Sequence, residues 1–446
     1  MPGTLDNDVV DVCATLIRFD TTNFGGNDAR PERPAAEWVA TRLSDAGYDP
    51  KILESSPGRA STVVRIPGSD RNAPALLAHG HLDVVPAHAA DWQRDPFAGE
   101  VVDDPVSGPS VWGRGALDMK DMDAMLLAVA LGFARDGFVP PRDIVLAFVA
   151  DEEDTGAYGA GFLAAEHREL FDGVTTAIGE SGGHRIVLPG GAHLYPVATC
   201  ERGTAWMRLT ARGPAGHGSR PAPQNAIATL ARALTRIADH RWPTRLIPAV
   251  QALLDGAAGH LGVPADADDP AVLEALGDVA GLITRTARNS LNPTMMQAGY
   301  KANVIPSEAT AVVDGRILPG TEDEFFATVD ELLGPDITRE FVSFTQPVGT
   351  THESAEFAAI ASAIRAHDPD AVVLPYCLGG GTDAKAFTSI GINCYGFAPG
   401  VFPHGFAAGD YVHGIDERVP ILSLHAGVRM VDAYLRSDPH VTEENR

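Results

Sequence analysis

Cysteine is scarce in this sequence and never occurs in a close pair. Only four of the 446 residues are cysteine, and they are scattered along the chain at Cys13, Cys200, Cys377 and Cys394. None of them forms a CxxC motif. This spacing argues against a disulfide framework or a zinc knuckle, and it predicts reduced thiols in the core.

Long apolar runs are also missing. The longest, such as LLAVALGFA beginning at Leu126, are too short to span a bilayer. The N-terminal stretch has acidic residues before its first basic residue, Arg18, and it lacks a small-residue cleavage segment, so we expect no secretory signal. Together these features predict a soluble, cytoplasmic protein.

Positive charge is the third scarce feature. The chain has 34 Lys and Arg residues against 59 Asp and Glu, which gives a formal net charge of −25 at pH 7. Nucleic acids and anionic lipids are bound by basic patches, so we expect no nucleic-acid or membrane partner. With 45% hydrophobic and 21% charged residues, the composition is that of a globular protein. The charge alone does not say whether some carboxylates gather in a site.

The first two hundred residues alternate between helical and strand patterns. Helical spacing runs through AAEWVATRLSDAGY from Ala35 and again from Met119 to Arg135. Short apolar runs, typical of buried strands, begin at Ser61, Ala75, Ile144 and Thr175. The alternation predicts an α/β domain with a mostly parallel sheet flanked by helices.

The pattern changes near residue 204. AWMRLTA alternates like a half-exposed strand, a helix is expected over 224–239, and further strands are expected near Met295 and from Ala309. Residues 242–290 form a helical, Ala-rich insertion between these strands.

We therefore expect two domains. The smaller one, an inserted α+β domain, would comprise residues 204–318. The larger one would comprise residues 1–203 and 319–446, where the α/β style returns. No internal repeat is visible.

Histidines and acids collect where predicted strands end. In LLAHGHLDVVP, His81 and Asp83 are two residues apart and point to the same side of an extended segment. A carboxylate beside an imidazole fixes its tautomer and raises its basicity, as in metal sites. Taken alone, this pair fits a strand-end histidine bonded to a loop equally well.

Two further clusters are richer in acids. Asp118 stands in GRGALDMKD just before a predicted helix, where it would serve either as a ligand or as an N-cap. Asp151, Glu152 and Glu153 follow the most apolar strand, and three adjacent acids there repel one another unless a cation or proton intervenes. Because adjacent side chains face different directions, Glu152 and Glu153 suit different tasks, one as a base and one as a ligand.

Glu180 in TTAIGESGG and His413 in DYVHGIDERVP complete the set. Sheets of this class bind ligands at the carboxyl ends of their strands. Mixed sets of histidine and carboxylate suit zinc, with cobalt or manganese as substitutes. The clusters together predict a metal site.

The motifs HGHLDVVP, GRGALDMKD and DEE, in this order, give the sequence a family resemblance over nearly its whole length. It resembles the dinuclear-zinc metallopeptidases that include aminoacylases, acetylornithine deacetylase, succinyl-diaminopimelate desuccinylase, glutamate carboxypeptidases and carboxypeptidase S. The resemblance implies a zinc-peptidase-like catalytic domain with an inserted lid or dimerisation domain. It also implies two Zn²⁺ ions, bridged by Asp118. His81 and Glu180 would complete one site, and Glu153 and His413 the other.

The resemblance also implies catalytic and substrate-binding roles. Asp83 would orient His81, and Glu152 would be the general base. His217 in GPAGHGSRP would stabilise the oxyanion, in dimeric relatives within the site of the partner subunit. Substrate contacts would come from Arg202, Asn303, Gly380, Gly381 and Thr382.

The function that the resemblance implies is hydrolysis of an amide or peptide bond through a metal-bridged hydroxide. The substrate would be a small carboxylate-bearing molecule, either a dipeptide or an N-acyl amino acid. The acid Glu180 is followed here by Ser181-Gly182-Gly183 where many relatives have proline, and the 242–290 insertion is longer than in minimal relatives. A homodimer through the lid domain, and the subunit in which His217 acts, are therefore left open.

Two other classes of function each have some support in the sequence. Gly179-Glu180-Ser181-Gly182-Gly183 fits the G-x-S-x-G nucleophile elbow of serine hydrolases and follows a predicted strand. An elbow must open into a helix, and the following HRIVLPGG opposes one. A non-catalytic metal-binding protein is disfavoured because Glu152 lies beside the expected ligands.

Overall fold

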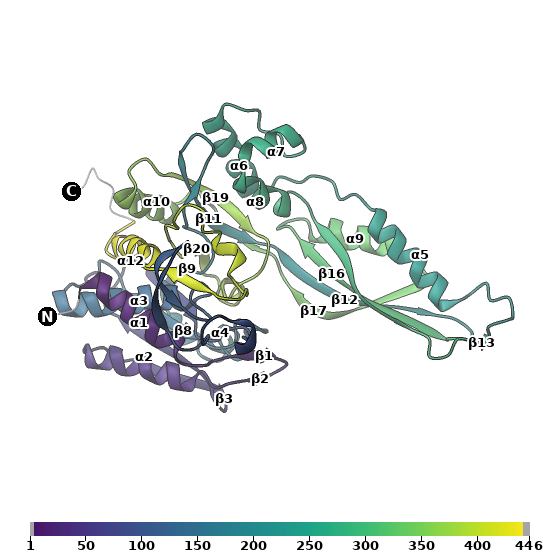
Figure 1. The fold of residues 1–446 in the computed structure, drawn as a ribbon, viewed down its shortest axis with the longest axis horizontal. Coiled ribbons are helices and arrows are strands. Elements are labelled where there is room, and N and C mark those ends of the chain that lie inside the picture. The colour runs from purple at the N-terminus through teal and green to yellow at the C-terminus, as the bar shows by residue number, and fades with distance from the viewer. Residues whose placement is uncertain (1–3, 440–446) are drawn as a thin grey trace. The chain divides into compact units, whose positions relative to one another are not determined.

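The computed structural model describes residues 4–439, which form two compact units (Figure 1). The first unit contains the chain up to Thr199, Thr350–Pro375 and the chain from Thr382. The second unit contains Cys200–Gly349 and Tyr376–Gly381. It begins close to the expected position but extends beyond 318, because β17 (Ile337–Thr345) pairs with β12 (Gly203–Arg212) in the same sheet.

A large mixed sheet forms the centre of the first unit. Four central strands run parallel: β20 (Asn393–Gly396), β9 (Val174–Gly179), β5 (Ala75–His81) and β8 (Ile144–Val149). The last three lie in the apolar runs that were expected to form strands. Antiparallel strands flank them, namely β4 (Arg59–Ile66) and β3 (Lys51–Ser56) beyond β8, and β11 (His193–Glu201) and β10 (Ile186–Val187) beyond β20. β18 (Val348–Gly349) and β19 (Val372–Leu378) also pair with β11. The parallel arrangement is therefore confined to the middle of the sheet.

Register brings the ends of the central strands to one edge. His81, the last residue of β5, pairs with Val149, the last residue of β8. Gly179 at the end of β9 pairs with Gly396 at the end of β20. The segments that follow β5, β8 and β9 therefore leave the sheet at the same edge, where parallel sheets place their ligands.

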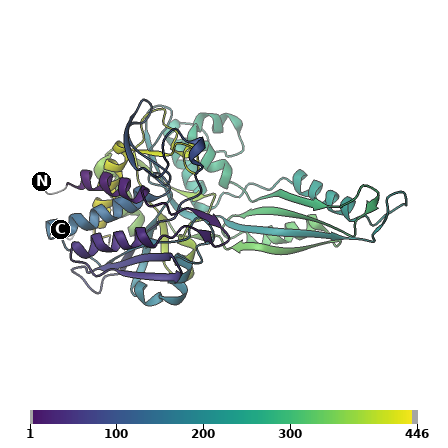
Figure 2. The ribbon, with the colours of Figure 1, turned by 60° about the horizontal axis from the view of Figure 1, so that its bottom comes forward.

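Helices cover both faces of this sheet. Alternate residues of β8 face opposite sides: Leu146 packs into one hydrophobic cluster and Ala147 into another. One face carries α1 (Leu5–Ile17), α2 (Arg33–Asp45), α3 (Lys120–Asp136), α10 (Ala355–His367) and α12 (Ile421–Leu435), several of which Figure 2 shows together. The other face carries α4 (Ala160–Glu166) and α11 (Ala384–Ser389).

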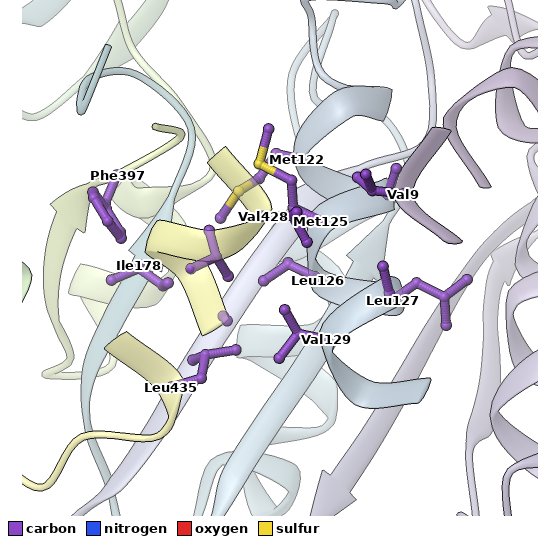
Figure 3. Packing of buried hydrophobic residues seen from close by; sticks show 14 of the residues in the cluster. Val9, Met122, Met125, Leu126, Leu127, Val129, Ile178, Phe397, Val428 and Leu435 are labelled. Carbon is purple, nitrogen blue, oxygen red and sulfur yellow. The ribbon is translucent and has the colours of Figure 1, made fainter. Parts of the chain in front are cut away.

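The methionine stripe of α3 belongs to the core. Met122 and Met125 are buried and lie between α3 and α12, near Val428 (Figure 3). Their flexible thioethers fill the space where these two helices approach the sheet.

Two small sheets complete the first unit. One joins β6 (Glu100–Asp104), β7 (Gly108–Trp112) and β21 (Arg418–Pro420), with Arg418 opposite Trp112. This pairing brings the segment before β21 next to the loop after β7. The other is the hairpin of β1 (Asn23–Gly25) and β2 (Asp28–Ala29).

The second unit is built on a four-stranded antiparallel sheet in the order β14 (Ser290–Ala298), β16 (Glu308–Ile317), β12 and β17. Burial alternates along β16, and its buried residues pack against α5 (Ala226–Asp239) and α9 (Glu322–Leu333). The expected helical insertion contains α6 (Pro248–Leu261), α7 (Pro270–Leu276) and α8 (Asp278–Thr286). A short pairing of β13 (Gly216–His217) with β15 (Val304–Ile305) lies outside the main sheet.

The structure also tests what the sequence predicts for the cysteines and for membrane-spanning helices. All four cysteines are free thiols, and three of them are buried. Across residues 4–439, no helix combines the length and the apolar composition needed to cross a bilayer. The cytoplasmic location stays a prediction.

Candidate metal centre

Two groups of side chains in the first unit have the geometry of metal sites. His81, Asp118 and Glu180 form one group, the first triad, and Asp118, Glu153 and His413 form the other, the second triad. Within each triad, the donor atoms lie within 4.8 Å of one another. Asp118 belongs to both triads, so the structure brings together all five predicted ligands.

The first triad is anchored on strand ends. His81 is completely buried, and its Nε2 lies 3.1 Å from Oδ1 of Asp118 and 3.7 Å from Oε2 of Glu180. Its Nδ1 lies 2.9 Å from the carbonyl oxygen of Asp83. Because that carbonyl only accepts hydrogen bonds, Nδ1 carries a proton, and Nε2, which faces Asp118 and Glu180, is the atom that would bind a metal ion.

The second triad depends on loops. Nε2 of His413 lies 3.1 Å from Oδ2 of Asp118 and 3.1 Å from Oε2 of Glu153. The His413 side chain is 51% exposed, and its backbone has a φ of 59°. Oε1 of Glu153 is buried and has no hydrogen-bond partner among the described residues. A cation held here would supply a counter-charge for that oxygen.

Burial dominates the electrostatics of these acids. It raises the pKa of Glu152 well above its ordinary value, and the neighbouring Glu180 carboxylate raises it further. Burial also raises the pKa of Glu153 and of Glu180. Acids gathered in this way stay ionised only beside positive charge. Imidazole nitrogens and carboxylate oxygens are suitable ligands for Zn²⁺, Co²⁺ or Mn²⁺, so the donor set fits a pair of divalent ions.

Asp83 holds the turn that carries Glu152 and Glu153. Its carboxylate accepts hydrogen bonds from the backbone N–H of Glu152 at 3.0 Å and of Glu153 at 3.1 Å. The side-chain amide of Asn23 donates to the same carboxylate at 2.9 Å. Asp83 therefore contacts His81 through its carbonyl and the Glu152 segment through its carboxylate. Glu152 itself belongs to neither triad.

A buried charge network lies behind this turn. Asp151, with a φ of 70°, accepts a hydrogen bond from Arg59 at 2.7 Å and from the backbone N–H of Tyr158 at 2.9 Å. Arg59 also pairs with Glu32 at 2.8 Å, and all three charged side chains are at most 4% exposed. The network fixes the backbone from which Glu152 and Glu153 project. No sequence motif pointed to Arg59, Glu32 or Asn23.

A second buried pair links the two loops of the second triad. The Glu417 carboxylate accepts hydrogen bonds from the backbone N–H of Leu117 at 2.7 Å and of Asp118 at 3.2 Å. Arg114 pairs with Glu417 at 2.5 Å and donates to the carbonyl of Gly414 at 2.8 Å. This Arg114–Glu417 pair ties the Asp118 loop to the His413 loop. Both residues lie inside the motifs that carry the ligands, but neither was singled out from the sequence.

Most of the predicted substrate contacts lie in the second unit. His217 and Asn303 are exposed neighbours there, since β13 pairs with β15 and the N–H of Gly218 donates to the Asn303 carbonyl at 2.9 Å. Thr382, by contrast, is a buried residue of the first unit.

The Arg202 guanidinium makes three hydrogen bonds within the second unit. It donates to the carbonyls of Arg285 at 2.7 Å and Arg316 at 2.8 Å, and to the Ser290 hydroxyl at 2.8 Å. It also lines a cavity of about 300 Å³ together with Gly380. Gly381 is exposed in the same segment.

The serine-hydrolase alternative lacks its structural requirement. Ser181 follows β9 and has a φ of 73°. The chain then continues through irregular backbone into the short strand β10, and no helix is found between residues 180 and 192. The segment is therefore not a nucleophile elbow, which would open directly into a helix.

Comparisons with known proteins agree with the geometry. The family model described as peptidase family M20/M25/M40 matches residues 77–437. A probable carboxypeptidase S-like 2 of Dictyostelium discoideum is 28% identical over 400 residues, covering 84% of this chain and 73% of the relative. Aminoacylase-1 of Sus scrofa is 26% identical over 371 residues, covering 82% and 81%.

A solved structure shares the fold. The M20 family metallo-carboxypeptidase Sso-CP2 of Sulfolobus solfataricus aligns with a TM-score of 0.70 at 16% identity, covering 97% of this chain and 100% of that one. Since the family model covers most of the chain, the family is established. This chain belongs to peptidase family M20/M25/M40 and is a hydrolase of that family.

Proposed function

We propose that this chain is a zinc-dependent hydrolase that cleaves an amide or peptide bond in a small carboxylate-bearing substrate. The substrate class is dipeptides or N-acyl amino acids. The observation that carries the proposal is the pair of triads that share Asp118, with a further, partly buried acid, Glu152, beside them. The similarity to an aminoacylase and to carboxypeptidases supports the substrate class.

The five proposed ligands would bind two metal ions. His81 and Glu180 would bind one ion, Glu153 and His413 would bind the other, and Asp118 would bridge both. When bound, two such ions lower the pKa of a water molecule and polarise a carbonyl group, which is the chemistry that amide hydrolysis needs. Cobalt or manganese would fit the same donor atoms.

Glu152 is the group best placed to move a proton. Its backbone N–H donates a hydrogen bond to the Asp83 carboxylate, and its side chain is not a member of either triad. Burial raises the pKa of its carboxyl group, which suits a base that accepts a proton from water and returns it to the leaving amine near neutral pH. Asp83 acts as a positioning residue for both His81 and Glu152.

The substrate contacts are proposed from the second unit and its neighbouring segment. The positive charge of Arg202 and the loop at Gly380 border one cavity, which would hold a terminal carboxylate. For His217 we keep the role of oxyanion stabiliser. The other proposed substrate contacts are Asn303, Gly381 and Thr382. A homodimer through the lid domain and a cytoplasmic location also stay predictions.

A metal-dependence experiment tests the proposal. The purified protein is treated with EDTA, dialysed, and assayed on a panel of dipeptides and N-acyl amino acids before and after Zn²⁺ is restored. We expect hydrolysis of at least one member, its loss with EDTA, and its recovery with zinc. Ser181→Ala is the matched control and should retain activity. Hydrolysis that resists EDTA and disappears in Ser181→Ala would refute the metal mechanism.

A further inference from the structure

The second unit contains a concentration of arginines, of which the proposed hydrolase function uses only Arg202. A cavity of about 360 Å³ is lined by Arg202, His240, Arg241, Trp242, Thr284, Arg285, Arg288, Asn289 and Ser290. We call it the arginine cavity. Four of these nine residues carry a guanidinium group, and none of the nine is an acid. This is unexpected in a chain whose formal net charge is −25.

Much of this positive charge has no counter-charge nearby. Of the four guanidinium groups, that of Arg288 pairs with Asp268 at 2.6 Å. In the part of the chain that the structure describes, the side chains of Arg241 and Arg285 form neither an ion pair within 4.0 Å nor a hydrogen bond. Gathering like charges around one cavity is unfavourable unless solvent or a bound anion compensates it.

Two further side chains that line the cavity, His240 and Arg202, distinguish it from an ordinary solvated surface. Nε2 of His240 is buried and has no hydrogen-bond partner among residues 4–439. Burial also lowers the pKa of the Arg202 guanidinium to about 10, so an anion close to it would favour the charged form. The end of α8 would account for Arg285, since basic residues in the last turn stabilise helix C-termini, and Arg288 is accounted for by its pairing with Asp268. Neither accounts for Arg241, which comes from the segment after α5.

We propose that the arginine cavity binds a small multivalent oxyanion, such as a phosphate ester or a dicarboxylate. Planar guanidinium groups bind phosphate and carboxylate oxygens in pairs, and cavities of this volume hold small ligands. The neighbouring cavity of about 300 Å³ also contains Arg202 and Arg285, but it is bordered by 376–380 and lacks Arg241 and Arg288. The proposal does not rest on the hydrolase function.

Trp242 supplies a local readout for the test. It lines the arginine cavity and stacks on Phe325 with a ring-centroid distance of 5.0 Å. The full-length protein is titrated with sodium sulfate, phosphate or succinate while chloride keeps the ionic strength constant, and tryptophan fluorescence is recorded. Acetate is the monovalent comparison. We expect a saturable change with at least one divalent anion and none with acetate.

Substituted proteins test whether the anion binds in the arginine cavity. Arg241→Gln with Arg285→Gln should weaken the affinity at least about tenfold, because two charge-assisted contacts are lost. Arg208→Gln with Arg232→Gln removes the same charge from exposed positions of the same unit, and the affinity should stay within about twofold. The fluorescence change should vanish in Trp242→Phe. Should the first double variant fail to fold, Arg241→Gln alone tests the same point, because the Arg241 side chain is exposed and forms no ion pair or hydrogen bond within residues 4–439.

The outcomes separate the ligand classes. Tighter binding of phosphate and sulfate than of succinate would indicate a phosphate-type ligand, and the reverse order a dicarboxylate. The proposal would be overturned by the absence of saturation with all three divalent anions. Equal weakening in both double variants, or an unchanged signal in Trp242→Phe, would overturn it as well.

Discussion

The two triads of the metal centre share Asp118 but are built in different ways. In the first triad, His81 ends a strand in the middle of the large sheet and is completely buried. In the second triad, His413 lies on irregular backbone after the short helix Ala408–Asp410, and half of its side chain is exposed. One histidine is positioned by the hydrogen-bond ladder of the sheet, and the other by a few loop contacts.

This difference shows which contacts fix the position of each metal-binding histidine. His81 itself pairs with Val149 of β8, and residues 75–78 of the same strand pair with β9 on the other side, so few single changes would move it. The position of His413 relative to Asp118 depends on the Arg114–Glu417 pair, which connects their two loops. We therefore expect the second triad to bind its ion more weakly and to release it first.

Removing the shared ligand should abolish the difference between the triads. In Asp118→Ala both sites lose a ligand, so we expect both ions to be lost and turnover to fall by more than about a thousandfold. Metal analysis and a hydrolysis assay measure the two effects. Asp103→Ala, an exposed acid on β6, is the control and should change neither. An Asp118→Ala protein that still held both ions would show that Asp118 bridges nothing.

Glu152→Gln should separate chemistry from binding in both triads. Glu152 is a ligand in neither, so both ions should remain while turnover falls about 10²- to 10⁴-fold through loss of the proton carrier. Metal content and kcat are measured on the same preparation. Near-normal turnover would remove Glu152 from the role of base, and loss of an ion would place it among the ligands.

Glu417→Gln should affect the two triads unequally. We expect affinity for the ion of the second triad to fall about 10- to 100-fold, as is typical when a partner of a metal ligand is changed, with little change in the first. Chelator-driven release, followed by a colorimetric zinc indicator, should show one accelerated phase.

The variant leaves the Arg114 charge buried without its partner, which costs about 3–5 kcal/mol of folding free energy. Arg114→Gln with Glu417→Gln removes both charges and provides the folded comparison. Release of both ions at wild-type rates in either folded variant would show that the pair does not position the second triad.

The smallest effect is expected from Asn23→Ala. This change removes one hydrogen bond to Asp83, one at 3.3 Å to Asp151 and one at 3.0 Å from the backbone N–H of Gly25, each of them contributing about 0.5–1.5 kcal/mol. Because Asp83 holds the Glu152 turn, kcat should fall by about tenfold or less while both ions stay bound. A changed metal content with unchanged kcat would mean that Asn23 supports the ligands rather than the base.

The sequence was most informative where function follows from local pattern. Apolar runs located β5, β8 and β9, so the residues at or just beyond their ends, such as His81, Glu153 and Glu180, were expected at one edge of a sheet. Helical spacing over 119–135 likewise located α3.

Contacts between distant segments could not be predicted in this way. Arg114 and Glu417 are 303 positions apart, and Arg59 and Asp151 are 92 apart, so no periodicity links either pair. The extent of the second unit was missed for a similar reason. The pairing of β17 with β12 joins segments more than a hundred residues apart, and nothing in the sequence of β17 identifies its partner.

The most direct test of the dinuclear centre is a count of zinc ions against activity. Metal-free protein is titrated with Zn²⁺ in a metal-buffered solution, and bound zinc and hydrolysis are measured at each step. The shared-ligand geometry predicts two bound ions per chain, with the second filling at a higher free zinc concentration and disappearing in His413→Ala. Saturation at one ion per chain, with full activity and no effect of His413→Ala, would contradict the dinuclear centre.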